Sequence, residues 1–258
     1  MRRVNQANDV SKFLKGYIAI RFLCHRLLGE NDLNKAQLFK RILIILIPLL
    51  LIAFAYIFYI GKDEPLPKMT VQEKKARFKS LILPVSQEVY SELMTRYNDV
   101  SEKIQTEGSD QFEDLKKEYK AANDDELLMA LKPHPISITL SQAAMESSWA
   151  TSRFFREAYN IFGVWSFDED EPRIAAGEKR GNKTIWVKKY SSIKAAIRDY
   201  YRTLARGSAF DEFRKLNMTT NDPYELVKKL DRYSEKGAKY GEELTSIIKY
   251  NKFHEYDK

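Results

Sequence analysis

The sequence predicts an α+β protein that is mainly helical, carries one small β lobe and is preceded by a transmembrane helix. Apolar residues recur at helical spacing through most of residues 70–131 and 190–255. Alternation of apolar and polar residues is confined to about 162–190, where two antiparallel strands joined by a long acidic loop are expected. One apolar run, residues 42–61, contains no charged residue, which is typical of a helix in a bilayer.

The composition excludes several classes of protein. Of 258 residues, 44% are hydrophobic and 31% are charged, which excludes a wholly disordered or collagen-like chain. Cys24 is the single cysteine, so no intramolecular disulfide can form. With one thiol and three histidines, a Cys/His zinc site is not expected, and neither is another metal or a cofactor.

Most of the net charge of +7 lies in the basic N-terminal segment, residues 1–41. This segment holds nine Lys and Arg residues against three acids, a net charge of +6. The positive charge therefore belongs to a tail beside an apolar run, and nucleic-acid binding is not expected. The tail lies on the anionic inner leaflet, binds a partner, or only sets the orientation of the chain.

The uncharged run at residues 42–61 is long enough to span a membrane. Twenty helical residues extend about 30 Å, which matches the hydrocarbon thickness of a bilayer. A cleavable signal peptide would have a shorter apolar region followed by small residues, and a buried core helix would contain some polar ones. We expect a single-pass anchor in the inner membrane. Because cationic segments stay inside, the N-terminus should be cytoplasmic and residues 62–258 periplasmic.

The exported part is expected to comprise a linker with a helical pre-domain, residues 62–130, and a catalytic domain, residues 131–258. Helical spacing covers 71–81, Pro84 is expected to break the helix, and helical spacing resumes over 85–104. Shorter helices are expected at 112–119 and 126–131. In the second domain, helices are expected at 138–148 and 193–204, from Pro223 onward, and over about 240–253.

One glutamate stands out on the helix expected at 138–148, for which Ser137 is the expected N-cap. Glu146 is the single Asp, Glu, Lys or Arg between Pro133 and Ser152. Helical spacing places Gln142 and Trp149 on the same face. Burial raises the pKa of a carboxyl group, and a raised pKa suits a general acid near neutral pH. The alternative is a buried glutamate with a purely structural hydrogen bond.

The helix sequence resembles the active-site helix of the bacterial glucosaminidases, the family 73 glycoside hydrolases, whose pattern is approximately L-x-Q-A-x-x-E-S-x-W-G-x-S. Here it reads Leu140-Ser-Gln-Ala-Ala-Met-Glu-Ser-Ser-Trp-Ala-Thr-Ser. Further elements match in order, namely Tyr159-Asn-Ile-Phe-Gly, Tyr190-Ser-Ser, Asp199-Tyr-Tyr and Tyr233-Ser-Glu-Lys-Gly-x-x-Tyr. Upstream, Glu73-Lys-Lys-x-x-Phe-x-x-Leu-x-x-Pro is similar to the Bax-like subgroup of Gram-negative bacteria. The resemblance covers about residues 70–255.

The resemblance implies a lysozyme-like fold that hydrolyses the β-1,4 bond after N-acetylglucosamine in peptidoglycan glycan strands. Glu146 matches the general acid, and Tyr233 matches a tyrosine of the family's active site. The side chains expected to bind substrate are Gln142, Trp149, Asn160, Phe162 and Tyr200, of which Trp149, Asn160 and Phe162 match groove or core positions of the family.

Three departures from the family pattern bear on this prediction. Tyr159 replaces the first Asn of an Asn-Asn pair, and Ala150 replaces the usual Gly. The family's second carboxylate has no fixed counterpart, and the candidates are Glu178, which we prefer, Glu169 and Glu171. The alternative function is therefore a catalytically weak protein of the cell envelope that binds peptidoglycan or acts as a scaffold. The sequence does not indicate which proteins the chain binds.

Overall fold

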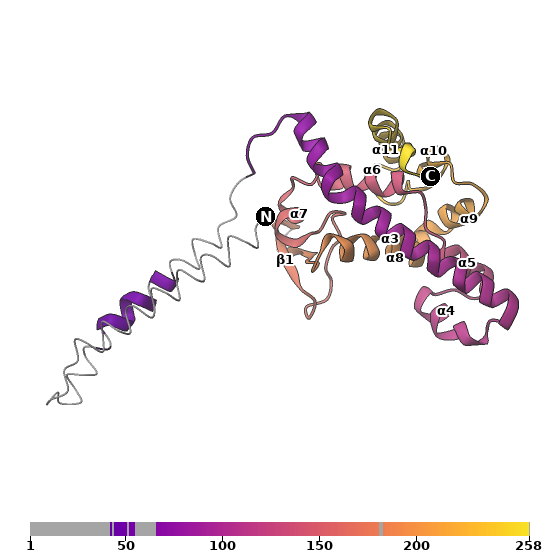
Figure 1. The fold of residues 1–258 in the computed structure, drawn as a ribbon, viewed down its shortest axis with the longest axis horizontal. Helices are drawn as coiled ribbons and strands as arrows, with labels where there is room; N and C mark the ends of the chain where they lie inside the picture. Colours follow the sequence, from indigo (N-terminus) through magenta and orange to yellow (C-terminus); the bar gives the residue numbers. More distant parts are fainter. Residues whose placement is uncertain (1–41, 43, 51, 55–65, 181–182, 258) are drawn as a thin grey trace. The chain divides into compact units, whose positions relative to one another are not determined.

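The computed structural model describes residues 42, 44–50, 52–54, 66–180 and 183–257 (Figure 1). The chain divides into two compact units, Met1–Glu64 and Pro65–Lys258. The described residues of the first unit are helical. Among the residues that the structure describes, no helix is both long enough and apolar enough to cross a membrane. Much of the expected anchor, including residues 55–61, lies outside the described residues, so the anchor stays a prediction.

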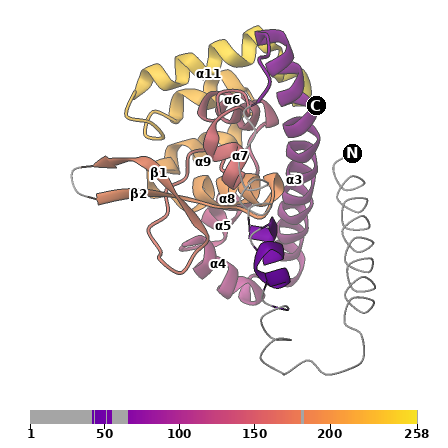
Figure 2. The ribbon, with the colours of Figure 1, turned by 90° about the vertical axis from the view of Figure 1, so that its left-hand side faces the viewer.

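The second unit is mainly helical with one two-stranded sheet, as predicted. In Figure 2 the strands lie on the opposite side of this unit from α3, with α6, α7 and α8 between them. The elements are α3 (Val71–Glu107), α4 (Glu113–Tyr119), α5 (Asp124–Leu131), α6 (Ile136–Glu146), α7 (Arg153–Ala158), β1 (Arg173–Arg180), β2 (Lys183–Lys188), α8 (Ile193–Arg206), α9 (Asp211–Thr219), α10 (Pro223–Leu226) and α11 (Ala238–Asn251), with short 3₁₀ helices η1 (Asp110–Phe112), η2 (Ser208–Phe210), η3 (Val227–Lys229) and η4 (Phe253–Tyr256).

The expected break at Pro84 does not occur, because α3 runs without interruption from Val71 to Glu107. Pro84 is exposed on this helix, while Phe78, Ile82 and Val89 are fully buried. Burial of that stripe against α6 and α8 outweighs the local cost of a proline inside the helix. The first half of α3 therefore belongs to the same core cluster as α6 and α8, whereas Val100, Tyr119 and Leu127 form a second cluster with Ala205 of α8.

Helix α6 lies in the centre of the second unit, against α3, α11 and η4. It begins at Ile136 with Pro135 at the N-cap, so the expected N-cap, Ser137, lies inside the first turn. The carboxylate of Asp257 caps the helix instead. It accepts hydrogen bonds from the Ser137 backbone N–H at 2.7 Å and from the Ser137 hydroxyl at 2.6 Å. A residue near the C-terminus thereby stabilises the start of the helix that ends at Glu146.

The β lobe differs from the expected hairpin. β1 and β2 pair directly, with Arg173 opposite Lys188 and Arg180 opposite Lys183, and a bulge lies between Ala175 and Lys179. The acidic residues 168–171 therefore precede β1, and the expected first strand near residue 165 reduces to one bridge between Trp165 and Val187. The segment 173–180 has weak strand patterning by itself, and pairing across a short connection decides its conformation.

Candidate active site

Glu146 is the last residue of α6, and its side chain is half-buried. Its Oε1 accepts a hydrogen bond of 2.9 Å from the hydroxyl of Tyr240 on α11. Burial raises the pKa of Glu146 above its ordinary value, and it outweighs the hydrogen bond from Tyr240, which acts in the opposite direction. The carboxyl group therefore keeps its proton to a higher pH than an exposed glutamate, as a general acid requires.

Two further charged groups lie close enough to influence Glu146. The charge of Lys236 lowers the pKa of Glu146, and that of Glu243 raises it. These two side chains form an ion pair of 2.6 Å with each other, and their charges act on Glu146 in opposite directions. Lys236 precedes α11 and Glu243 lies on it. Neither was predicted from the sequence to belong to the site. The only signal was the Tyr233-to-Tyr240 motif, which contains Lys236 and ends at Tyr240.

The chain turns sharply directly after Glu146. Ser148, Trp149 and Ala150 all have positive φ angles, of 51°, 62° and 59°. The Ser147 hydroxyl holds this turn, since it donates to the Ala143 carbonyl oxygen at 2.5 Å and accepts from the Ala150 N–H at 2.8 Å. Three consecutive left-handed residues without a glycine are uncommon, and strain of this kind concentrates at functional sites.

This turn gives Trp149 a different place from the expected one beside Glu146 and Gln142. Its indole ring packs edge-on against Phe78 of α3 at 5.3 Å between ring centroids, and at 6.3 Å from Phe253 of η4. The ammonium group of Lys75 lies 4.9 Å from the indole centroid. The helix ends before Trp149, so helical spacing from Glu146 no longer applies, and the side chain fills the contact with α3.

The structure brings Tyr233 into the site with Glu146. Its ring stacks on that of Tyr240, with centroids 5.5 Å apart and 16° between the ring planes. Burial raises the pKa of the Tyr233 phenol, and the charge of Glu146 adds to that increase. Tyr233 therefore stays neutral at working pH, and its hydroxyl can donate a hydrogen bond.

A chain of buried hydrogen bonds connects Glu146 to the far end of α6. The Tyr240 hydroxyl, which donates to Glu146, accepts from Gln142 Nε2 at 3.0 Å. The Tyr200 hydroxyl donates to Gln142 Oε1 at 2.5 Å and lies 3.0 Å from His134 Nε2. Each side chain of this series is hydrogen-bonded to the next, so the series fixes the orientation of Tyr240 and hence of Glu146.

Four residues of the predicted substrate-binding set are buried, and they hold the site in position. Gln142, Tyr200, Phe162 and Asn160 are each at most 4% exposed, so direct contact with a substrate does not fit their burial. Phe162 stacks on Tyr200 with ring centroids 4.0 Å apart. The Asn160 amide donates to the carbonyl oxygens of Val164 and Lys188 and accepts from the Val164 N–H. Asn160 therefore joins the chain after α7 to the end of β2.

The candidates for a second carboxylate lie in or before β1. Glu169 forms an ion pair of 3.4 Å with Arg173, and Glu171 one of 3.2 Å with Lys188. Hydrogen bonds from Ser166 and then Lys188 hold the pKa of Glu171 below its ordinary value, so this group stays ionised. Glu178 lies in β1 beside the bulge, and its side chain is outside the described residues. The choice among the three stays a prediction.

Comparison with known families decides which class of protein this site belongs to. A family model described as mannosyl-glycoprotein endo-β-N-acetylglucosaminidase, the glucosaminidase model, matches residues 125–253, half of the chain. The chain belongs to the glucosaminidase family. This confirms the resemblance seen in the sequence, and it makes the protein a glycoside hydrolase.

Individual relatives of this glucosaminidase match parts of the chain. Protein bax from Escherichia coli (strain K12) is 28% identical over 123 residues, which are 45% of this chain and 43% of that relative. The chain thus spans less than half the length of this curated relative.

Solved structures match with lower similarity. The glycoside hydrolase domain of FlgJ from Salmonella typhimurium is 25% identical in a C-terminally truncated form, with 49% of this chain and 90% of that chain covered and a TM-score of 0.38. The catalytic domain of the autolysin Auto from Listeria monocytogenes is 19% identical, with 74% of this chain and 100% of that chain covered and a TM-score of 0.40.

In the part of the glucosaminidase that the structure describes, no group of three or more His, Cys, Asp or Glu side chains could hold a metal ion.

Proposed function

We propose that this glucosaminidase hydrolyses the β-1,4 bond after N-acetylglucosamine in peptidoglycan, with Glu146 as the general acid. The observation that carries the proposal is the half-buried carboxyl group of Glu146, whose pKa is raised at the end of an otherwise uncharged helix. Membership of the glucosaminidase family supports the reaction class. The motif resemblance supports peptidoglycan as the substrate and a lysozyme-like pairing of the helical part with the β lobe.

In the proposed reaction, protonated Glu146 donates its proton to the glycosidic oxygen as the bond to the sugar carbon breaks. The resulting oxocarbenium-like charge needs stabilisation on the opposite side. In the first alternative, a carboxylate of the β lobe activates water. Glu171 is a candidate because it is ionised, and Glu178 is the candidate preferred from the sequence. In the second alternative, the substrate's acetamido oxygen assists. In the second case the Tyr233 hydroxyl is suited to orient the acetamido group.

Replacing Glu146 tests the proposal. Glu146→Gln keeps the shape of the side chain and the hydrogen bond to Tyr240 but cannot supply the proton. We expect turnover of purified peptidoglycan to fall by about 10²–10⁴-fold, with little change in the melting temperature. Glu242→Gln, an exposed change on α11, is the matched control and should keep full activity. Normal turnover by Glu146→Gln would show that Glu146 is a structural glutamate.

We also propose that residues 42–61 anchor the enzyme in the inner membrane with the catalytic unit in the periplasm, where peptidoglycan lies. The support is the uncharged run of twenty residues behind a basic segment of net charge +6. A phosphatase reporter that is active only after export, fused after Lys258, should be active. A cytoplasm-only reporter at the same position should be inactive, and the reverse pattern would contradict this localisation.

A further inference from the structure

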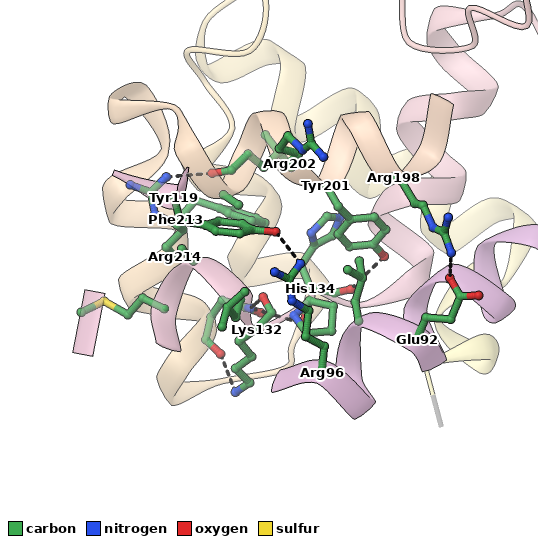
Figure 3. A pocket seen from close by; sticks show the side chains of 18 residues that line it. Glu92, Arg96, Tyr119, Lys132, His134, Arg198, Tyr201, Arg202, Phe213 and Arg214 are labelled. Carbon is green, nitrogen blue, oxygen red and sulfur yellow. Dashed lines mark hydrogen bonds and ion pairs between the residues drawn. The ribbon is translucent and has the colours of Figure 1, made fainter. Parts of the chain in front are cut away.

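A cavity of about 250 Å³ lies between α3, α5, α8 and α9, in a part of the molecule that the proposed reaction does not use (Figure 3). Its wall is strongly basic. It holds one acid, Glu92, and five cationic side chains, Arg96, Lys132, Arg198, Arg202 and Arg214. His134 also lines the cavity, and burial lowers its pKa to about 3, so it is neutral at physiological pH.

Two of the five cations are already paired with carboxylates. Glu92 accepts from Arg198 at 2.5 Å through one oxygen and from Lys194 at 2.6 Å through the other, so both of its oxygens are engaged. Arg214 forms an ion pair with Asp211 and donates to the carbonyl oxygens of Leu204 and Gly207. These contacts leave no acid on the wall to neutralise the remaining cations.

Among the described residues, no carboxylate lies within 4.0 Å of the charged groups of Arg96, Lys132 or Arg202. Arg96 donates to the Tyr119 hydroxyl at 3.1 Å, which leaves most of its N–H groups available (Figure 3). Lys132 donates to the backbone oxygen of Asn217 at 2.8 Å. Burial lowers the pKa of Lys132, as expected for an ammonium group without a negative partner.

We propose that this cavity binds a small organic dianion whose charged groups are carboxylates or phosphate. Arginine and lysine together on one wall are the side chains that bind such groups, arginine through two parallel hydrogen bonds. A volume of about 250 Å³ corresponds to roughly eight water molecules, which exceeds what one phosphate or one carboxylate fills. Apolar side chains of Leu131, Leu204 and Phe213 on the same wall suit a short hydrocarbon link.

The cavity is separate from the candidate active site. Its lining includes His134, just before α6, whereas Glu146 ends that helix, roughly 15 Å further along. Arg202 is exposed on α8 and no described contact holds it, so it can be changed without breaking the fold. Arg206, one turn later on the same helix, does not line the cavity and provides a matched control.

Titration calorimetry on the full-length chain in an uncharged detergent at low ionic strength tests the proposal. The probes are glutarate for carboxylates and glycerol 3-phosphate for phosphate, and glutaramide and glycerol are the neutral analogues. We expect saturable binding of at least one dianion and none of its neutral analogue. Binding of glutarate alone assigns carboxylate chemistry, and binding of glycerol 3-phosphate alone assigns phosphate chemistry.

The variants locate the binding site. Arg202→Gln and Arg96→Gln should each weaken binding by about five- to thirty-fold, the usual effect of losing one charge-assisted contact. Arg206→Gln should leave the affinity unchanged, and circular dichroism verifies that all three variants fold. The proposal is overturned if neither dianion binds saturably to the wild-type chain. It is also overturned if Arg206→Gln weakens binding as much as the two cavity variants do.

Discussion

Glu146 is subject to two opposing influences on its protonation. Burial favours the neutral carboxyl group, and the hydrogen bond from Tyr240 favours the carboxylate. A general acid is active only while protonated, so the rate should fall as the pH rises through its pKa.

The raised pKa of Glu146 also makes the folded state bind its proton more tightly than the unfolded chain. The stability that this contributes is present at low pH and is lost as the pH rises from about 4.5 through the folded pKa.

Tyr240→Phe is expected to move the basic limb of the pH profile of kcat/KM to higher pH. The change removes the hydrogen bond that stabilises the Glu146 carboxylate, so the pKa of Glu146 should rise further. It also leaves Gln142 Nε2 without its partner, which should cost about 1–3 kcal/mol of stability. Rates measured from pH 4 to 9 and normalised to their maximum give the position of the limb.

Tyr250→Phe is the matched control, because Tyr250 lies on the same helix but is 81% exposed. Its profile should superpose on that of the wild type. A basic limb that stays in place in Tyr240→Phe, or that moves to lower pH, would show that Tyr240 does not tune the acid of the reaction.

The sequence identified Glu146 because it is the one acid on an otherwise uncharged helix. It could not identify the hydrogen bond that tunes it, since Glu146 and Tyr240 are 94 residues apart along the chain and meet only when α6 packs on α11. The predicted position of Trp149, on the same helix face as Glu146, was wrong for a local reason. Three consecutive left-handed residues end the helix after Glu146 without the glycine that usually marks such a turn.

At the scale of elements, α6 depends on a cap supplied from the other end of the unit. Asp257→Ala removes the acceptor for two donors of the first turn of α6 and should lower the free energy of unfolding by about 1–2 kcal/mol. Urea unfolding measures this change, and Glu255→Ala, an exposed acid in η4, is the control that should have little effect. Equal stability of Asp257→Ala and the wild type would contradict the capping role.

Helical periodicity predicted where most of the helices lie, but local signals failed at two elements. Pro84 is a helix-breaking signal, yet α3 continues through it because the apolar stripe from Phe78 to Val89 is buried on both sides of the proline. The alternating pattern near Trp165 predicted a strand, yet β2 takes most of its pairing from 173–180. Both outcomes depend on contacts between segments, which single-segment patterns do not contain.

At the scale of the whole molecule, the predicted class was correct for the part that the structure describes, a mainly helical unit with one small sheet. Helix α3 of the expected pre-domain supplies Phe78, Ile82 and Val89 to the core around α6. Helix α3 thus supports the turn after Glu146 directly, since Arg77 donates to the Ala150 carbonyl oxygen at 2.8 Å. The region before the family match is therefore part of the catalytic unit's structure.

The most direct test of the proposed activity is mass spectrometry of the muropeptides released when the full-length chain, in detergent micelles, is incubated with purified peptidoglycan sacculi. Hydrolysis after N-acetylglucosamine creates new N-acetylglucosamine reducing ends, which borohydride reduction marks by a mass increase. We predict that the wild-type chain produces these ends and that Glu146→Gln produces almost none. Reducing ends of N-acetylmuramic acid, cleavage in the peptide stems, or equal product from Glu146→Gln would contradict the account.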